Sequence, residues 1–171
     1  MKKLFLLAAT FVAGFAVMAQ KADDVIKISN DTYNFGKIKQ GVPVTTFFAV
    51  TNKSDKPVIL ESVVASCGCT TPEWSKEPVA PGATSQIKVG YNAASPTPFT
   101  KDITIRVAGV QEPKIIHITG EVLAADAYDA YTKTDDYKKA ETEKAKQLKA
   151  DAKNEKKTSK KSSKKTSTST K

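Results

Sequence analysis

The chain has little of the side-chain chemistry that most metal sites and active sites require. Its 171 residues include two cysteines, one histidine, one tryptophan and two methionines. Both methionines, Met1 and Met18, lie within the first 19 residues, so the rest of the chain offers no thioether ligand. A closed zinc site usually needs four cysteine or histidine ligands, and Cys67, Cys69 and His117 are the only three. A zinc site built by one chain alone is therefore not expected.

Familiar catalytic motifs are absent as well. The sequence has no Gly-x-Ser-x-Gly, no phosphate-binding loop and no His-Glu-x-x-His. Cys67 and His117 could in principle act as nucleophile and base, but two residues alone are weak evidence for a hydrolase. We therefore expect a non-enzymatic protein that needs no cofactor.

Acidic residues are scarce at one end of the chain, and the net charge is unevenly placed. The whole sequence carries +9. From Ala152 onward there are eight lysines and one acid, whereas Gln20 to Asp151 holds 17 basic and 17 acidic residues and is neutral. The basic character belongs to the tail, which argues against nucleic-acid or membrane binding by a folded body.

Residues 1–19 are predicted to be a secretory signal peptide. Two lysines precede an apolar stretch from Leu4 to Val17, and Val17-Met18-Ala19 provides a cleavage site before Gln20. The stretch is shorter than the ~20 residues that span a bilayer, and no cysteine follows the cleavage site to carry a lipid. No later segment is apolar enough to span a membrane. We expect export to the periplasm, the cell envelope or the exterior of a bacterium.

Residues 20–123 are predicted to form one β-domain. Strand-like segments with period-two alternation are separated by Gly, Pro, Asn and Asp: Val25–Ser29, Tyr33–Ile38, Val44–Asn52, Val58–Ala65, Thr84–Tyr91, Asp102–Ala108 and Lys114–Val122. About seven short strands with such turns predict an all-β, two-sheet antiparallel sandwich. Val58, Leu60 and Val64 are expected on one face, and Phe47, Phe48 and Trp74 in the core. Asn92–Phe99, which contains two prolines, is predicted to be a loop or a sheet edge.

The remaining residues differ sharply in composition. Residues 124–151 are rich in Ala, Lys, Glu and Asp and are predicted to be a charged, partly helical linker. Residues 152–171 contain Lys, Ser and Thr with almost nothing to bury, so disorder is predicted. The tail either attaches to an anionic surface or polymer or simply solubilises the protein; its paired lysines are Lys156, Lys157, Lys160, Lys161, Lys164 and Lys165. No aromatic residue follows Tyr137, so sequence-specific nucleic-acid recognition is not expected.

Cys67-Gly68-Cys69-Thr70 is the most distinctive motif. On an extended strand, the Cβ atoms of residues i and i+2 lie about 6.5 Å apart, whereas a disulfide needs about 3.5–4.5 Å. The cysteines can therefore bond only if the chain bends at Gly68, and such a disulfide would be strained and easily reduced.

The motif leaves four possibilities open. The cysteines are a local structural pair, a redox couple that exchanges disulfides with a partner, a two-thiolate metal site suited to Cu(I), or a covalent link to another chain or a cofactor.

Several motifs together resemble a known family. They are Phe35-Gly36-Lys37-Ile38 with Gly41, Phe48-x-Val50-x-Asn52, Cys67-Gly68-Cys69-Thr70, Pro81-Gly82 and Ile118-Thr119-Gly120-Glu121-Val122. The sequence resembles a bacterial domain-of-unknown-function family whose members are immunoglobulin-like and similar to hydin-type and pilus-chaperone-like domains. The resemblance implies an immunoglobulin-like sandwich and implies little about activity.

Two functions follow from these observations. The first is an exported, non-enzymatic binding or scaffolding module whose partner, a protein or an envelope polymer, is not specified by the sequence. A sheet edge is one place where a partner strand could add. The alternative is an exported thiol-redox or metal-handling protein that uses Cys67 and Cys69.

Overall fold

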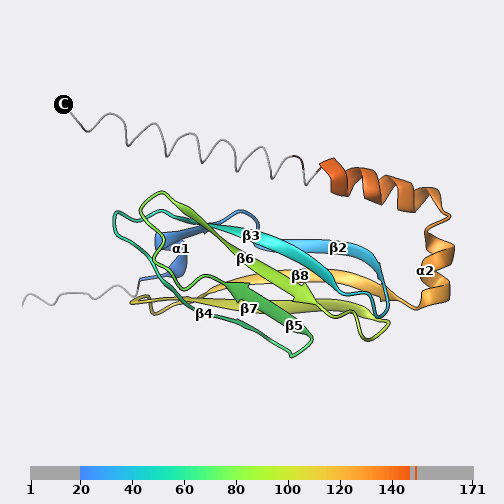
Figure 1. The fold of residues 1–171 in the computed structure, drawn as a ribbon, viewed down its shortest axis with the longest axis horizontal. Helices are drawn as coiled ribbons and strands as arrows, with labels where there is room; N and C mark the ends of the chain where they lie inside the picture. Colours follow the sequence, from blue (N-terminus) through green and yellow to red (C-terminus); the bar gives the residue numbers. More distant parts are fainter. Residues whose placement is uncertain (1–19, 147–148, 150–171) are drawn as a thin grey trace, which may run out of the picture.

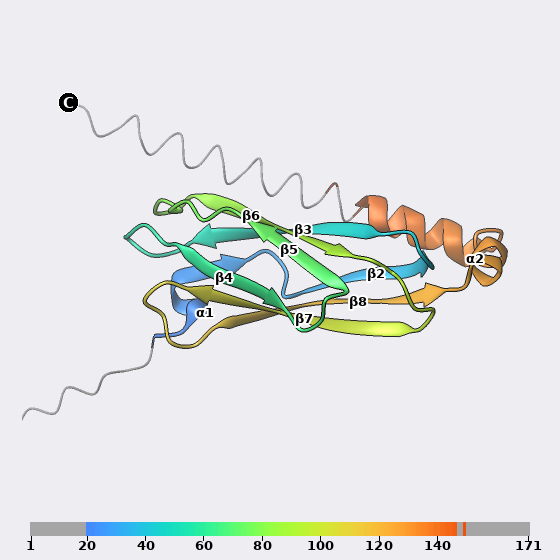
Figure 2. The ribbon, with the colours of Figure 1, turned by 60° about the horizontal axis from the view of Figure 1, so that its bottom comes forward.

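The computed structural model describes residues 20–146 and 149, and within them two four-stranded sheets face each other. One sheet has the order β1 (Ile26–Ile28), β3 (Val44–Asn52), β6 (Thr84–Tyr91) and β5 (Thr70–Trp74). The other has the order β2 (Thr32–Lys39), β8 (Lys114–Leu123), β7 (Pro98–Val107) and β4 (Leu60–Ala65). Figures 1 and 2 show the two layers from directions 60° apart.

These strand orders are those of a constant-type immunoglobulin domain. Such a domain has strands A, B, E and D in one sheet and C, F and G in the other. Here β1 and β2 take the place of a first strand that changes sheets, since β1 pairs with β3 and β2 pairs with β8. The prediction of an immunoglobulin-like β-sandwich is confirmed.

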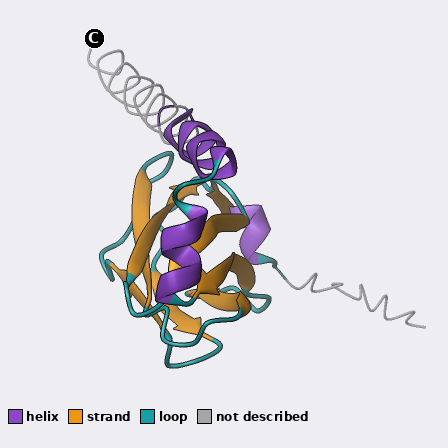
Figure 3. Cartoon of the chain, turned by 90° about the vertical axis from the view of Figure 1, so that its right-hand side faces the viewer, coloured by secondary structure: helices purple, strands orange, loops and turns teal. Residues whose placement is uncertain are grey.

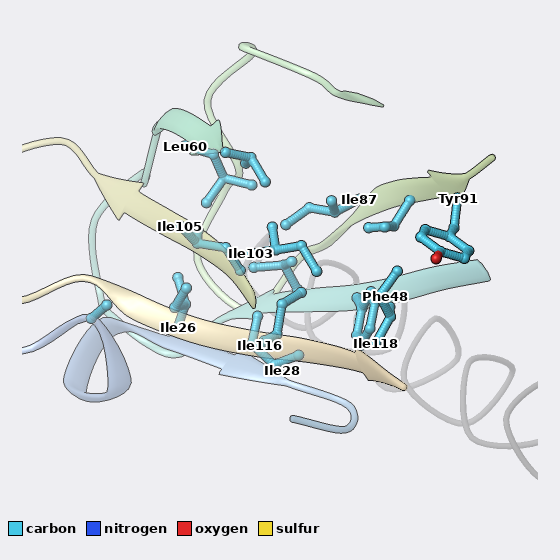
Figure 4. Packing of buried hydrophobic residues seen from close by; sticks show 14 of the residues in the cluster. Ile26, Ile28, Phe48, Leu60, Ile87, Tyr91, Ile103, Ile105, Ile116 and Ile118 are labelled. Carbon is cyan, nitrogen blue, oxygen red and sulfur yellow. The ribbon is translucent and has the colours of Figure 1, made fainter. Parts of the chain in front are cut away.

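The core lies between the sheets and is mainly aliphatic, with a few aromatic side chains that include Phe48 and Tyr91 (Figure 4). Inward-facing residues alternate along the strands as predicted: Ile87, Val89 and Tyr91 on β6, Ile103, Ile105 and Val107 on β7, and Ile116, Ile118 and Val122 on β8 are all buried. Phe48 is buried as expected, but Phe47 is 58% exposed, because adjacent residues of a strand point to opposite faces.

One buried polar side chain folds the turn after β3. Asn52 is 1% exposed, and its Nδ2 donates to the carbonyl oxygens of Lys56 and Val79 at 2.7 and 2.8 Å. Its Oδ1 accepts hydrogen bonds from the backbone N–H and the hydroxyl of Ser54, both at 2.8 Å. The amide of Asn52 therefore has both its donors and its acceptor satisfied within this turn, which the Ser54 hydroxyl also supports by donating to the Lys56 carbonyl oxygen at 2.9 Å.

Five details of the strands differ from the predictions. Val25 ends a short helix, α1 (Ala22–Val25), before β1 begins. A register shift between Leu60 and Ser62 turns Val63 inward and leaves Val64 58% exposed, so the predicted facing of Val64 is wrong.

The other three differences are in the extent, number and direction of the strands. β7 begins at Pro98 rather than Asp102, with Pro98 at the first position, where a missing N–H is tolerated. β5 is an additional strand, and β2 runs parallel to β8, so the sandwich is not wholly antiparallel.

Helical segments follow the last strand. α2 (Ala125–Tyr131) lies at the end of the sandwich where β8 finishes, and residues 135–146 are also helical (Figures 1 and 3). Lys39 on β2 forms a 2.8 Å ion pair with Asp129, and the Lys37 ammonium lies 4.9 Å from the centre of the Tyr131 ring. Contacts from β2 therefore hold α2 against the β-domain.

The predicted signal peptide (residues 1–19) and the lysine-rich tail (152–171) lie outside the described residues. In the part that the structure describes, no helix has both the length and the apolar character needed to cross a membrane.

Candidate functional site

The Cys-Gly-Cys-Thr motif forms the crossing from one sheet to the other. β4 belongs to one sheet and β5 to the other, and the motif lies between them (Figure 2). The backbone N–H of Thr70 donates to the carbonyl of Cys67 at 3.2 Å, which closes a tight turn. The backbone N–H of Asn92 donates to the carbonyl of Cys69 at 3.1 Å and fixes the turn to the end of β6.

In this turn Cys67 and Cys69 are joined in a disulfide. Their Cα atoms are 5.3 Å apart, closer than two residues of extended chain allow, so the chain bends at Gly68. Both cysteines are half-buried, and Cys69 packs against the hydrophobic core.

The disulfide closes too short a loop to stabilise the sandwich strongly. In the chain-entropy relation, a loop of three residues lowers the free energy of folding by roughly 1.6 kcal/mol, against about 3 kcal/mol for fifteen residues. It also links residues that are already neighbours in sequence. The crossing has a further tie, because Trp74 Nε1 donates to the carbonyl of Leu60 at 3.0 Å and so joins β5 to β4 without the sulfurs.

Thr70 is the buried polar group of this turn. It is 4% exposed, and its hydroxyl oxygen lies 3.7 Å from Cys67 Sγ and 3.9 Å from Cys69 Sγ. One hydroxyl is therefore within reach of both sulfurs. The sequence marked Thr70 as part of the motif but gave it no separate role.

His117 is not a partner of the cysteines. Its Nδ1 lies 2.8 Å from Asp102 Oδ1 on the exposed face of the sheet, and the Cys67 sulfur is bonded to Cys69. The structure does not assemble Cys67 and His117 as nucleophile and base. Within residues 20–146 and 149, no group of three or more His, Cys, Asp or Glu side chains is placed to hold a metal ion.

A second candidate site is an open hollow of about 590 Å³ on the outer face of the β2–β8–β7 sheet. Strand residues and the helical extension contribute to its lining: Asn34, Gly36, Lys37, Pro98, Phe99, Thr100, Thr119, Gly120, Glu121, Tyr131 and Asp136. Its wall includes both cationic and anionic side chains, so the hollow suits a polar partner with charges of either sign.

Two glycines shape the floor of this hollow. Gly36 has φ +69°, a conformation that side chains disfavour, and its N–H donates to Asn34 Oδ1 at 2.8 Å within the bulge of β2. Gly120 leaves no room for a side chain, because a Cβ there would lie 2.8 Å from Phe99 Cζ and 2.9 Å from the Gly36 carbonyl oxygen.

Tyrosines fix the helical wall of the hollow. The Tyr131 ring meets the Tyr137 ring edge-on at 5.6 Å, and burial raises the pKa of Tyr131. This site was not predicted. Five of its strand residues (Gly36, Lys37, Thr119, Gly120 and Glu121) belong to two motifs of the family resemblance, but nothing in the sequence indicated that α2 would lie beside them.

The sheet edges are poorly suited to accept a partner strand. β1 has three residues, β5 contains Pro72, and β2 and β4 each carry a register shift. Short, bulged or proline-containing edges disfavour strand addition. The hollow is therefore a better candidate for partner binding than any edge.

Comparison with known proteins gives a family and a fold. The family described as "Protein of unknown function (DUF1573)" matches residues 26–122. The ASH / PapD-like domain of human CEP192 is similar with a TM-score of 0.51 and 7% identity, over 71% of this chain and 99% of that chain. At this identity the likeness shows a shared fold alone.

Two further structures are similar. A protein of unknown function from Porphyromonas gingivalis W83 has a TM-score of 0.49 and 16% identity, over 63% of this chain and 51% of that chain. The SrpA adhesin from Streptococcus sanguinis has a TM-score of 0.45 and 12% identity, over 67% of this chain and 62% of that chain. This chain thus spans about half the length of the Porphyromonas protein. No protein with a curated description matches it.

Proposed function

We propose that this chain, which belongs to the family described as "Protein of unknown function (DUF1573)", is an exported, non-enzymatic binding or scaffolding module. The observation that carries this proposal is the open hollow beside α2. A protein or an envelope polymer is the partner, and the groups that face it include Lys37, Glu121 and Asp136.

The shape and chemistry of the hollow support a macromolecular partner. Small-molecule sites are mostly apolar clefts that bury most of the ligand's surface, whereas this hollow is open and its wall carries charged side chains. A segment of a larger partner can lie across such a surface and bury it on binding.

Export and the basic tail complete the proposal. The N-terminal segment directs the protein to the envelope or the exterior, and the lysines from residue 156 to residue 165 hold it near anionic polymers. The body is neutral by sequence count, so the attraction to such polymers comes from the tail and weakens as salt rises.

A photo-crosslinking experiment tests the hollow. A benzophenone amino acid replaces Lys37 in the hollow or, as a matched control, Lys27, an exposed lysine on β1 in the other sheet. Irradiation of living cells is expected to give a discrete adduct from position 37 only, and Glu121→Lys in the same chain should weaken it. Equal adducts from both positions, or none from either, would overturn the proposal.

Two measurements test the remaining parts. Cell fractionation with N-terminal sequencing should find the mature protein beginning at Gln20 outside the cytoplasm. Truncation after Asp151 should abolish retention on heparin at low salt. A full-length chain with an intact leader in the cytosol would refute export, and unchanged retention would refute the role of the tail.

A further inference from the structure

The cysteine turn has properties that a purely structural disulfide does not need. The bond joins residues separated only by Gly68, and the N–H bonds of Thr70 and Asn92 and the Trp74 indole already fix the crossing. Cleaving the disulfide therefore leaves the sandwich with its core and its backbone ties. Because the fold does not depend on this disulfide, the bond can be reduced and formed again without unfolding the domain.

The two sulfurs differ in their surroundings. Cys69 packs against the hydrophobic core, whereas Cys67 is not among the residues that do so. An incoming thiolate therefore meets the Cys67 sulfur more readily. Attack at Cys67 makes Cys69 the leaving thiolate.

Thr70 is positioned to assist that departure. Its hydroxyl is buried and lies 3.9 Å from Cys69 Sγ. A hydroxyl donor stabilises a thiolate and lowers its pKa, and a leaving thiol of lower pKa departs faster. The same hydroxyl lies 3.7 Å from Cys67 Sγ, so it can also donate to the Cys67 thiolate when that thiolate is released.

We propose that Cys67-Gly68-Cys69-Thr70 is a thiol–disulfide exchange site that oxidises a dithiol partner, with Cys67 as the attacked sulfur and Thr70 as the positioning residue. This function goes beyond partner binding in the hollow and does not depend on it.

The exchange balances in two steps. A partner thiolate attacks Cys67 Sγ, the Cys67–Cys69 bond breaks, and the electron pair leaves on Cys69, which gives a mixed disulfide between the partner and Cys67. The partner's second thiolate then attacks its own sulfur in the mixed disulfide and releases the Cys67 thiolate. The partner dithiol becomes a disulfide, and the two released thiolates take up the protons that the partner thiols lost.

Single cysteine variants test which sulfur is attacked. The full-length exported protein with Cys69→Ser retains the Cys67 thiol, and incubation with oxidised glutathione should yield a glutathione adduct by mass spectrometry. The Cys67→Ser variant should form this adduct about tenfold more slowly. Equal rates for the two variants, or no adduct with either, would overturn the assignment.

Thr70 variants test the positioning role through a pH profile. Thr70→Val removes the hydroxyl and should shift the pH profile of iodoacetamide alkylation of the reduced protein to higher pH, since a hydrogen bond to the thiolate is lost. Reduction of the disulfide by dithiothreitol should then slow about three- to fivefold near neutral pH, because the leaving thiolate is less stable. Thr70→Ser should restore both the rate and the profile. A valine variant with an unchanged profile would refute the role of the hydroxyl.

A folding control separates exchange from structure. The protein reduced with dithiothreitol should keep its far-ultraviolet circular dichroism and its tryptophan emission, and it should return to the disulfide form in oxidised glutathione. Loss of the fold on reduction would show that the bond is structural and would refute the proposal. The crosslink from position 37 tests the hollow separately.

Discussion

Replacement of Gly120 by alanine is the most direct test of how the strands approach one another. Gly120 on β8 is paired with Phe99 on β7. The added Cβ would lie 2.8 and 2.9 Å from two carbons of the Phe99 ring and 2.9 Å from the Gly36 carbonyl oxygen. These distances are well inside normal van der Waals contact, so at least one neighbour must move.

Neither neighbour moves easily. Phe99 is 6% exposed, and its ring stacks on that of Tyr91 with centroids 4.1 Å apart, so turning the ring breaks a buried contact. Gly36 is held by its bond to Asn34 within the bulge of β2, so displacing its carbonyl shifts that strand against β8. Overpacking of a rigid site costs about 1–3 kcal/mol, and two rigid neighbours place Gly120→Ala at about 2–3 kcal/mol.

Urea unfolding measures this loss. Trp74 is the only tryptophan, so its fluorescence reports the transition without interference. With m-values of about 1–3 kcal/mol/M, the midpoint should fall by about 0.7–3 M.

Gly90→Ala is the matched control. Gly90 is also in a β-strand, but its Cβ would meet only the Thr71 carbonyl oxygen, at 3.7 Å, an ordinary contact. Alanine restricts the backbone of the unfolded chain more than glycine does, so this variant should be as stable as wild type or more stable by up to about 1 kcal/mol. Substitutions that disturb no packing change the free energy of unfolding by less than about 0.5 kcal/mol. A loss for Gly120→Ala within that range would refute the close approach of β2, β7 and β8.

Three further predictions concern stability. Asn52→Ala should lower the free energy of unfolding by about 2–3 kcal/mol, because buried backbone groups lose their partners; calorimetry showing a loss below about 1 kcal/mol would contradict this. Hydrogen bonding to Asp31 raises the pKa of Lys114 above its usual 10.5. The contribution of this lysine to the free energy of unfolding is therefore fully present below the unfolded-state pKa of about 10.4. It is lost as the pH rises through the higher folded-state pKa. Lys114→Met should therefore weaken the alkaline loss of stability in urea titrations at successive pH values, and an unchanged pH dependence would contradict this. The double variant Cys67→Ser, Cys69→Ser should lower stability by no more than roughly 1.6 kcal/mol; a thermal scan showing an unfolded chain would contradict the local role of the bond.

The sequence was sufficient to predict strands whose alternation is strict, and insufficient where one residue changes the pattern. β6 and β8 follow their alternation throughout, so their buried residues could be listed in advance. In β4, a register shift reverses the facing of the residues after Leu60, and a bulge leaves no clear mark in local hydrophobicity. β5 escaped prediction because it is short, contains Pro72 and resembles a loop in composition.

Long-range arrangement explains the other differences. The parallel pairing of β2 with β8 depends on how the first strand crosses between sheets, which periodicity does not encode. The cysteine motif could be singled out because cysteine is rare in this chain, but its position as a crossing between sheets required the topology. The hollow could not be predicted, since it is formed by strands and helical segments that are far apart in sequence.

Three of the motifs of the family resemblance are connected through one buried ring, that of Phe99. Phe99 stacks on Tyr91, which pairs across the strands with Thr70 of the cysteine motif. The Phe99 ring also lies against Gly120, with its centroid 6.4 Å from that of the Phe35 ring, and Phe99 and Gly120 both line the hollow. The cysteine turn and the hollow are therefore linked through the stacked pair of Tyr91 and Phe99, so a change that displaces Phe99 is expected to affect both.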